Sequence, residues 1–260
     1  MTIGMYESLI LPSHRPRRYG LLQAADVTTY GSGTQRWLAG VDAVALDVEH
    51  LTGIDLTACD PPASGDWDLT ATASGGPYEF RAFSSIIRAQ CGTTSGPDTL
   101  EAMVANTRAE HMALLPDILD RELILGSISG VTTNSLATLA TGTNPTGAVT
   151  GAALVGHAEA LVDQYESIIL IPSVLFPAAA DAAVLDGSVW RTRSGNVIVP
   201  QSADANVYAL PAPLMVKLIE PDVSPRSWVE RSLNDVEAQS TIMGMFEFRA
   251  DEVVKFDPTP

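Results

Sequence analysis

The sequence has little positive charge and almost no lysine. Of its 260 residues, 15 are Lys or Arg and 31 are Asp or Glu, so the formal net charge at pH 7 is −16. Proteins that read nucleic acids neutralise phosphates with clustered basic side chains, so this composition argues against such a function. The one basic cluster, His14-Arg15-Pro16-Arg17-Arg18, is interpreted as a solubilising and partner-binding arm, with a DNA contact as the alternative.

Long apolar runs are also missing. The longest strongly apolar run, residues 167–172, has strand length, whereas a membrane-spanning helix needs about 20 apolar residues. Residues 1–11 lack the basic start, apolar core and cleavage site of an export signal. We therefore expect no membrane anchor and folding in a cytoplasm. Because 46% of residues are hydrophobic and 18% are charged, we expect a sizeable core in one large domain or two intimately joined subdomains.

Cysteines and catalytic motifs are scarce. Cys59 and Cys91 have no metal-ligand spacing; reduced thiols are the default, and a disulfide formed after release from the cell is the alternative. The four histidines are far apart, and no nucleophile elbow or phosphate-binding loop occurs. Asp117, Asp120 and Glu122 are interpreted as a solvated helix face rather than a metal site. The sequence therefore predicts no enzyme, no cofactor and no metal.

A long helix is the strongest local pattern. Thr94-Ser95-Gly96-Pro97-Asp98 has the composition of a helix start, with Pro tolerated in the first turn and acidic residues at the positive end of the helix dipole. Apolar residues at helical spacing follow, which predicts a helix over residues 96–125. Pro116 is expected to kink this helix or to begin a new one. His111 is interpreted as a hydrogen-bonded, partly buried side chain rather than a metal ligand.

Strand patterns dominate the rest of the chain. Residues 1–36 are expected to form an extended arm, and residues 37–92 a β-rich segment with a long outward loop. Period-two alternation over residues 78–83 predicts a half-covered strand. Short helices are expected at residues 156–162 and 172–183, and strands at residues 167–171, 189–193, 196–199, 207–210, 214–219, 242–248 and 252–256.

This order of elements resembles that of the major capsid proteins of tailed bacteriophages. These proteins have the Hong Kong 97-type fold, which is also the fold of encapsulins. The residues 18–22, 36–41, 110–126 and 157–176 resemble phrases in capsid proteins of phages that infect high-GC, actinobacterial hosts. The resemblance implies an α+β fold with an N-terminal arm, an extended β loop, a long spine helix and an axial domain. The implied parts are an arm at 1–36, the extended β loop and start of the peripheral domain at 37–92, the spine helix at 93–130, the axial domain at 131–238, and closing strands of the peripheral domain at 239–260, which would return beside the spine.

The resemblance also implies a structural function. Pentamers and hexamers of the chain would build an icosahedral virion shell, assembled in a host cytoplasm, that encloses double-stranded DNA without reading its sequence. Scaffolding and portal proteins are expected partners, a cement or decoration protein is a further one, and no membrane is expected. Contacts between copies are expected at Arg15, Arg17, Arg18, Tyr19, Leu21 and Leu22 in the arm and at Trp67, Tyr78 and Phe80 in the loop, with packing inside one subunit as the alternative for the aromatic residues.

One departure concerns covalent crosslinking. Some capsids of this fold join a lysine of the extended loop to an asparagine, but residues 1–216 contain no lysine. The shell would then hold through noncovalent contacts, a Cys59–Cys91 bridge or a cement protein. Three other interpretations stay open: an encapsulin-type compartment that binds a cargo peptide, a tail-tube or connector protein, and an unrecognised hydrolase with a concave polar pocket.

Overall fold

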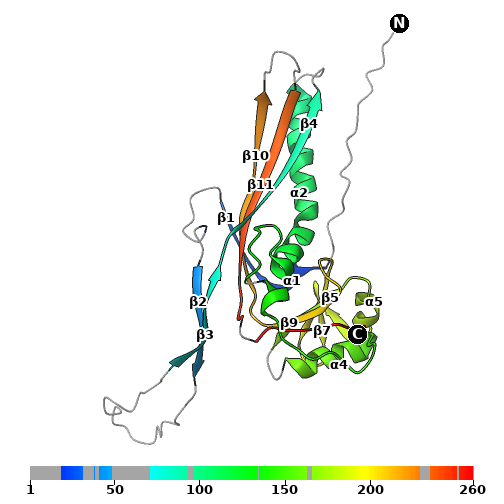
Figure 1. Cartoon of the computed structure of the whole chain (residues 1–260). Helices are drawn as coiled ribbons and strands as arrows, with labels where there is room; N and C mark the ends of the chain where they lie inside the picture. Colours follow the sequence, from blue (N-terminus) through cyan, green and yellow to red (C-terminus); the bar gives the residue numbers. More distant parts are fainter. Residues whose placement is uncertain are drawn as a thin grey trace, which may run out of the picture.

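A computed structural model of the chain describes residues 19–31, 38, 41–48, 71–92, 97–133, 135–162, 166–228, 235–250 and 252–259. In this part of the chain the strands form sheets of four, six and two strands. A long helix lies along the four-stranded sheet, and the six-stranded sheet forms a compact body near one end of that helix (Figure 1). The two-stranded hairpin points away from this body (Figure 1).

Helix α2, Pro97–Leu125, is continuous through Pro116. The predicted helix is therefore confirmed, and the alternative that a new helix begins at the proline is wrong. A proline inside a helix removes one hydrogen bond and crowds the preceding turn, at a cost of about 3 kcal/mol. Tertiary packing outweighs that cost, because Pro116 is buried and the nearby Leu115 and Leu119 lie in the main hydrophobic core.

The four-stranded sheet has the order β1-β10-β11-β4, in which β1 is parallel to β10 and the other neighbours are antiparallel. Helix α2 packs on β10, β11 and β4. The predicted strands 214–219 and 242–248 are the inner parts of longer strands, whose outer parts are rich in polar residues and proline and so hide the strand pattern. The bounds are β1 Asp26–Tyr30, β4 Phe83–Gly92, β10 Met215–Trp228 and β11 Asp235–Glu247.

The predicted extended β loop is confirmed as a hairpin. Strands β2, Val41–Val48, and β3, Ala71–Phe80, pair antiparallel, with Val41 opposite Phe80 and Val48 opposite Ala71. The register shifts on both sides of Ala45. After Phe80 the chain passes directly into β4, so the hairpin is attached to the body at the inner end of the four-stranded sheet (Figure 1).

The six-stranded sheet has the order β12-β9-β5-β8-β7-β6, with β5 parallel to β8 and antiparallel to β9. Its short helices are α3, Leu136–Leu139, α4, Gly151–Leu161, and α5, Phe176–Ala180. The strand bounds are β5 Ser167–Pro172, β6 Ala183–Asp186, β7 Val189–Thr192, β8 Val197–Gln201, β9 Val207–Pro211 and β12 Val254–Phe256.

Strand β5 separates two hydrophobic clusters. Ile168 and Leu170 face the main core, which also contains residues of α2 and of the four-stranded sheet. Ile169 and Ile171 face a second core beneath α4 and α5. A strand covered on both faces needs apolar residues at every position, which explains the continuous apolar run in the sequence. The main core joins α2 and both larger sheets in one packed unit.

Three segments differ from the sequence-based expectations. Residues 21–30, expected in the arm, form helix α1, Leu21–Ala24, and strand β1, and Leu21 is completely buried. The helix expected at 172–183 is only α5, and β6 begins at Ala183. Strand β12 does not return beside α2 with β11 but pairs with β9, because Phe256 packs in the second core. Within the described residues no helix is long and apolar enough to cross a membrane.

Candidate assembly surfaces

Four phenylalanines join the hairpin to the body. The rings of Phe80 and Phe248 lie 5.1 Å apart between centroids, and those of Phe83 and Phe246 lie 5.8 Å apart and stack. Gly244 in β11 leaves room for this packing, since a Cβ atom there would lie 2.6 Å from Phe83 Cζ. Aromatic pairs of this kind add about 0.5–1.5 kcal/mol beyond their buried area. The root of the hairpin is therefore a fixed attachment.

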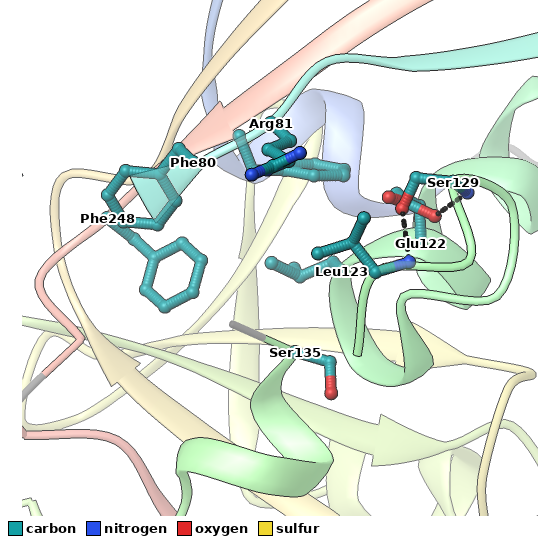
Figure 2. A pocket seen from close by; sticks show the side chains of 9 residues that line it. Phe80, Arg81, Glu122, Leu123, Ser129, Ser135 and Phe248 are labelled. Atoms are coloured by element: carbon teal, nitrogen blue, oxygen red, sulfur yellow. Dashed lines mark hydrogen bonds between the residues drawn. The ribbon is translucent and has the colours of Figure 1, made fainter. Parts of the chain in front are cut away.

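A small cavity of about 40 Å³ lies beside this root, lined by residues that include Phe80, Phe248 and Glu122. Figure 2 shows the two rings next to each other and Glu122 bonded to the loop that follows α2. The carboxylate Oε2 of Glu122 accepts the N–H groups of Ile128 and Ser129, both at 2.9 Å. The cavity has room for water but is far smaller than the roughly 300 Å³ that small-molecule pockets require.

The interpretation of Asp117, Asp120 and Glu122 as a solvated helix face is wrong for Asp120 and Glu122, whereas Asp117 is partly exposed. Asp120 is 1% exposed and Glu122 is 8% exposed. Both carboxylates accept backbone N–H groups, Asp120 from Ser202 at 3.1 Å and Glu122 from the loop after α2. That loop begins at Gly126, whose φ of +63° ends the helix. Helical spacing alone could not distinguish a water-facing carboxylate from one that fixes a distant loop.

His111 joins α2 to two strands. Its ring is fully buried, with Nδ1 2.9 Å from Ser240 Oγ in β11 and Nε2 3.1 Å from Ser85 Oγ in β4. Burial lowers the pKa of His111 to about 4, and a hydrogen bond with Ser240 raises this pKa by a smaller amount. The ring is therefore neutral at pH 7 and acts as a structural connector. This confirms the interpretation of His111 as a hydrogen-bonded side chain.

A larger cavity of about 340 Å³ lies between β1 and the six-stranded sheet. Its lining includes the charged residues Asp26, Glu166 and Arg191. Arg191 Nη1 donates to the Gly195 carbonyl oxygen at 3.0 Å and its Nε lies 3.4 Å from Asp186 Oδ2. Histidine and cysteine are missing from the lining residues, and the described residues contain no cluster suited to a metal ion. The charged lining residues are two carboxylates and a guanidinium, and Ser167 adds a hydroxyl group.

Three large apolar side chains are exposed, one in the turn before α5 and two in β6. Val174 is 84% exposed, Val184 is 69% exposed and Leu185 is 39% exposed. The last two belong to β6, which is an edge strand of this sheet. Edge strands and exposed apolar residues are features of surfaces that contact other chains. We call Val174, Val184 and Leu185 the axial patch.

The residues predicted at contacts between copies lie in different surroundings. Leu21 and Phe80 are buried in the core of their own chain. Tyr19 packs edge-on against Trp190 at 6.0 Å, and Leu22 lies against the main core. Whether these residues also contact neighbouring copies stays a prediction. The remaining predicted positions lie outside the described residues or side chains: Arg15, Arg17, Arg18, Cys59 and Trp67 entirely, and Tyr78 in β3 and Cys91 in β4 for their side chains.

Both lysines contact oxygen atoms of this chain. Lys217 in β10 forms an ion pair with Glu247 in β11. Lys255 Nζ in β12 donates to the Ala137 carbonyl oxygen at 2.6 Å. Neither lysine belongs to the hairpin, since the sequence of residues 41–80 contains no lysine.

Solved structures match this chain over nearly its whole length. The SrpI encapsulin complex of Synechococcus elongatus PCC 7942 aligns with a TM-score of 0.60 and 11% identity, over 99% of this chain and 92% of that one. The capsid of the empty GTA particle aligns with a TM-score of 0.57 and 12% identity, over 100% and 96%. The Gordonia phage Cozz structure aligns with a TM-score of 0.54 and 11% identity, over 96% and 89%.

The chain has the Hong Kong 97-type fold. This confirms the α+β fold expected from the order of elements, with α2 as the spine helix and the β2–β3 hairpin as the extended loop. By sequence the chain matches no protein-family model and no curated protein. At identities of 11–12%, the structural likeness identifies the Hong Kong 97-type fold and does not by itself identify the function.

Proposed function

We propose that this chain is the major capsid protein of a tailed bacteriophage. Many copies assemble into an icosahedral shell that encloses double-stranded DNA, and the chain has no catalytic function. The observation that carries this proposal is the end-to-end similarity to shell-forming proteins, including a GTA particle capsid and an encapsulin. Repeated contacts, each individually modest, hold such an assembly when they form many times per subunit.

Two surfaces are proposed to make these contacts. The first is the hairpin, which points away from the six-stranded sheet in Figure 1 and whose root is fixed by Phe80 and Phe83. The second is the axial patch. Apolar contacts suit this chain, because copies with a net charge of −16 repel one another and burial of apolar surface must overcome that repulsion.

The acidic composition also fits a container for DNA. A wall of like charge repels packaged DNA and keeps it from adhering. We propose pentamers and hexamers as the assembly units, a scaffolding protein and a portal as partners, and assembly in a host cytoplasm. A cement or decoration protein is a further proposed partner, since the hairpin cannot supply a lysine for covalent crosslinks.

An encapsulin-type compartment is the second candidate, because an encapsulin complex aligns with the TM-score of 0.60 given above. The two candidates differ in what the shell encloses. A phage capsid encloses DNA and needs a portal, whereas an encapsulin encloses proteins that carry a cargo peptide.

Electron microscopy of the purified chain, alone and with a candidate scaffolding protein, tests the proposal. Closed icosahedral shells support it, and nuclease-protected DNA in particles from infected cells separates the capsid from the encapsulin. Rings or tubes would indicate a connector or tail-tube protein instead. A chain that remains a compact monomer at high concentration, under every assembly condition tried, contradicts shell formation.

A further inference from the structure

The loop between β8 and β9, residues 202–206, is held by polar side chains of the loop and of the two strands beside it. Gln201 is completely buried, and its Nε2 donates to the carbonyl oxygens of Asp204 at 2.7 Å and Asn206 at 3.0 Å. The Tyr208 hydroxyl donates to Asp204 Oδ2 at 2.5 Å. Burial alone would raise the pKa of Asp204, but hydrogen bonds from Tyr208 and Asn206 lower it overall. The loop is therefore preorganised by these contacts.

One end of this loop contacts the spine helix. Ser202 N–H donates to Asp120 Oδ2 at 3.1 Å, and Ser202 Oγ donates to Asp117 Oδ1 at 2.8 Å. The two acceptors lie three residues apart on α2, so they are neighbours on one helix face. Hydrogen bonds to carboxylates are stronger than those between neutral groups. The single residue Ser202 thus makes two charge-assisted contacts to α2.

Gln201, at the end of β8, also holds the exposed turn before α5. The carbonyl oxygen of Gln201 accepts both the N–H and the Oγ–H of Ser173, each at 2.8 Å. The residue after Ser173 is Val174, the 84% exposed member of the axial patch. A continuous path of hydrogen bonds and two peptide links therefore runs from α2 through Ser202 and Gln201 to this turn.

Apolar packing alone would orient these parts poorly. Helix α2 and the six-stranded sheet share the main core, but apolar contacts are non-directional, whereas hydrogen bonds require a defined distance and angle. We propose that Ser202 is a positioning residue. Its bonds to Asp117 and Asp120, with the Gln201 carbonyl bonds to Ser173, are here called the Ser202 bridge, and this bridge fixes the Val174 turn relative to the spine helix.

Hydrogen exchange at the Ser173 amide tests the bridge in the full chain, whether or not shells form. Asp117→Ala removes the bond from Ser202 Oγ and leaves the bond from Ser202 N–H to Asp120 in place. Asp117 lies on α2, whereas the reporter amide bonds to Gln201. We expect exchange at Ser173 to become about fivefold faster, the equivalent of one hydrogen bond of about 1 kcal/mol. Ser202→Ala should give the same increase, and the double variant should exceed neither single variant by much, because both act on one path. Ser202→Thr retains the hydroxyl and the N–H and should restore slow exchange.

Glu101→Ala is the matched control, since Glu101 is an exposed acidic residue on the same helix. Exchange at Ser173 that is unchanged in Asp117→Ala, or that changes equally in Glu101→Ala, overturns the inference. Strictly additive effects of Asp117→Ala and Ser202→Ala overturn it as well. A second readout rests on the proposed function: shells of Ser202→Ala should vary more in diameter than wild-type shells. If no shells form at all, the exchange result still decides the role of Ser202.

Discussion

Replacing His111 with Gln should weaken the dependence of stability on acid pH. The buried ring has a pKa of about 4, while an unfolded chain has histidine near its ordinary 6.5. Between these values the unfolded state binds a proton that the folded state does not, so the free energy of unfolding falls as pH falls. Each pH unit costs about 1.4 kcal/mol, or about 3 kcal/mol over the window. His111 therefore contributes fully above pH 6.5, and its contribution is lost progressively towards pH 4.

Urea denaturation of unassembled wild-type and His111→Gln chains across this window measures the effect. Carboxylates titrate in both proteins, so the difference between the two curves isolates the histidine. Glutamine can still bond to Ser85 and Ser240 but does not titrate, so the variant should be less stable than wild type at pH 7 and lose the gap on acidification. Parallel curves from pH 6.5 to about 4 would refute the argument from burial.

The remaining predictions concern packing and assembly. Gly244→Ala should lower the free energy of unfolding by about 1–3 kcal/mol, because the new methyl group collides with Phe83. Urea denaturation measures this loss. A loss below the error of the method would contradict the close packing of Phe83 on Gly244. Phe80→Ala should lower the free energy of unfolding by about 3–5 kcal/mol in the same assay. A variant as stable as wild type would show that Phe80 does not fix the root of the hairpin. Val184→Asp should abolish or slow assembly as followed by light scattering. The control variant Ser188→Asp, in the nearby exposed turn, should assemble normally. Equal assembly of the two variants would contradict the proposal that β6 contacts other copies.

Periodic, local signals made much of the Hong Kong 97-type fold predictable. The long helix has a start signal and apolar residues at helical spacing, and α2 confirms it to within a residue at its first position. The apolar run of β5 was recognisable because every position is buried. Strand β6 was missed because the sequence Ala178–Leu185 is rich in residues that suit a helix, and pairing with β7 decides its structure.

Long-range contacts account for what the sequence could not predict at the candidate surfaces. Ser85 and Ser240 meet His111 only because two strands pack beneath α2. Asp120 is buried by a loop that lies 82 residues further along the chain. No periodicity in the sequence of α2 marks a carboxylate that will meet such a loop, so a polar helix face was the natural interpretation.

The two-sided burial of β5 has a consequence for strand alignment. Ile168, Ile169, Leu170 and Ile171 are nearly equal in size and polarity, so sliding the strand by one residue would exchange similar side chains between the two cores. Hydrophobicity, which usually prevents such slippage, discriminates little here. Polar contacts at the two ends of β5 set the alignment instead. Ser167 N–H donates to Asn196 Oδ1 at 3.0 Å at one end, and Ser173 N–H donates to the Gln201 carbonyl oxygen just after the other end. Correct alignment of the central strand thus depends on a few polar atoms at its two ends.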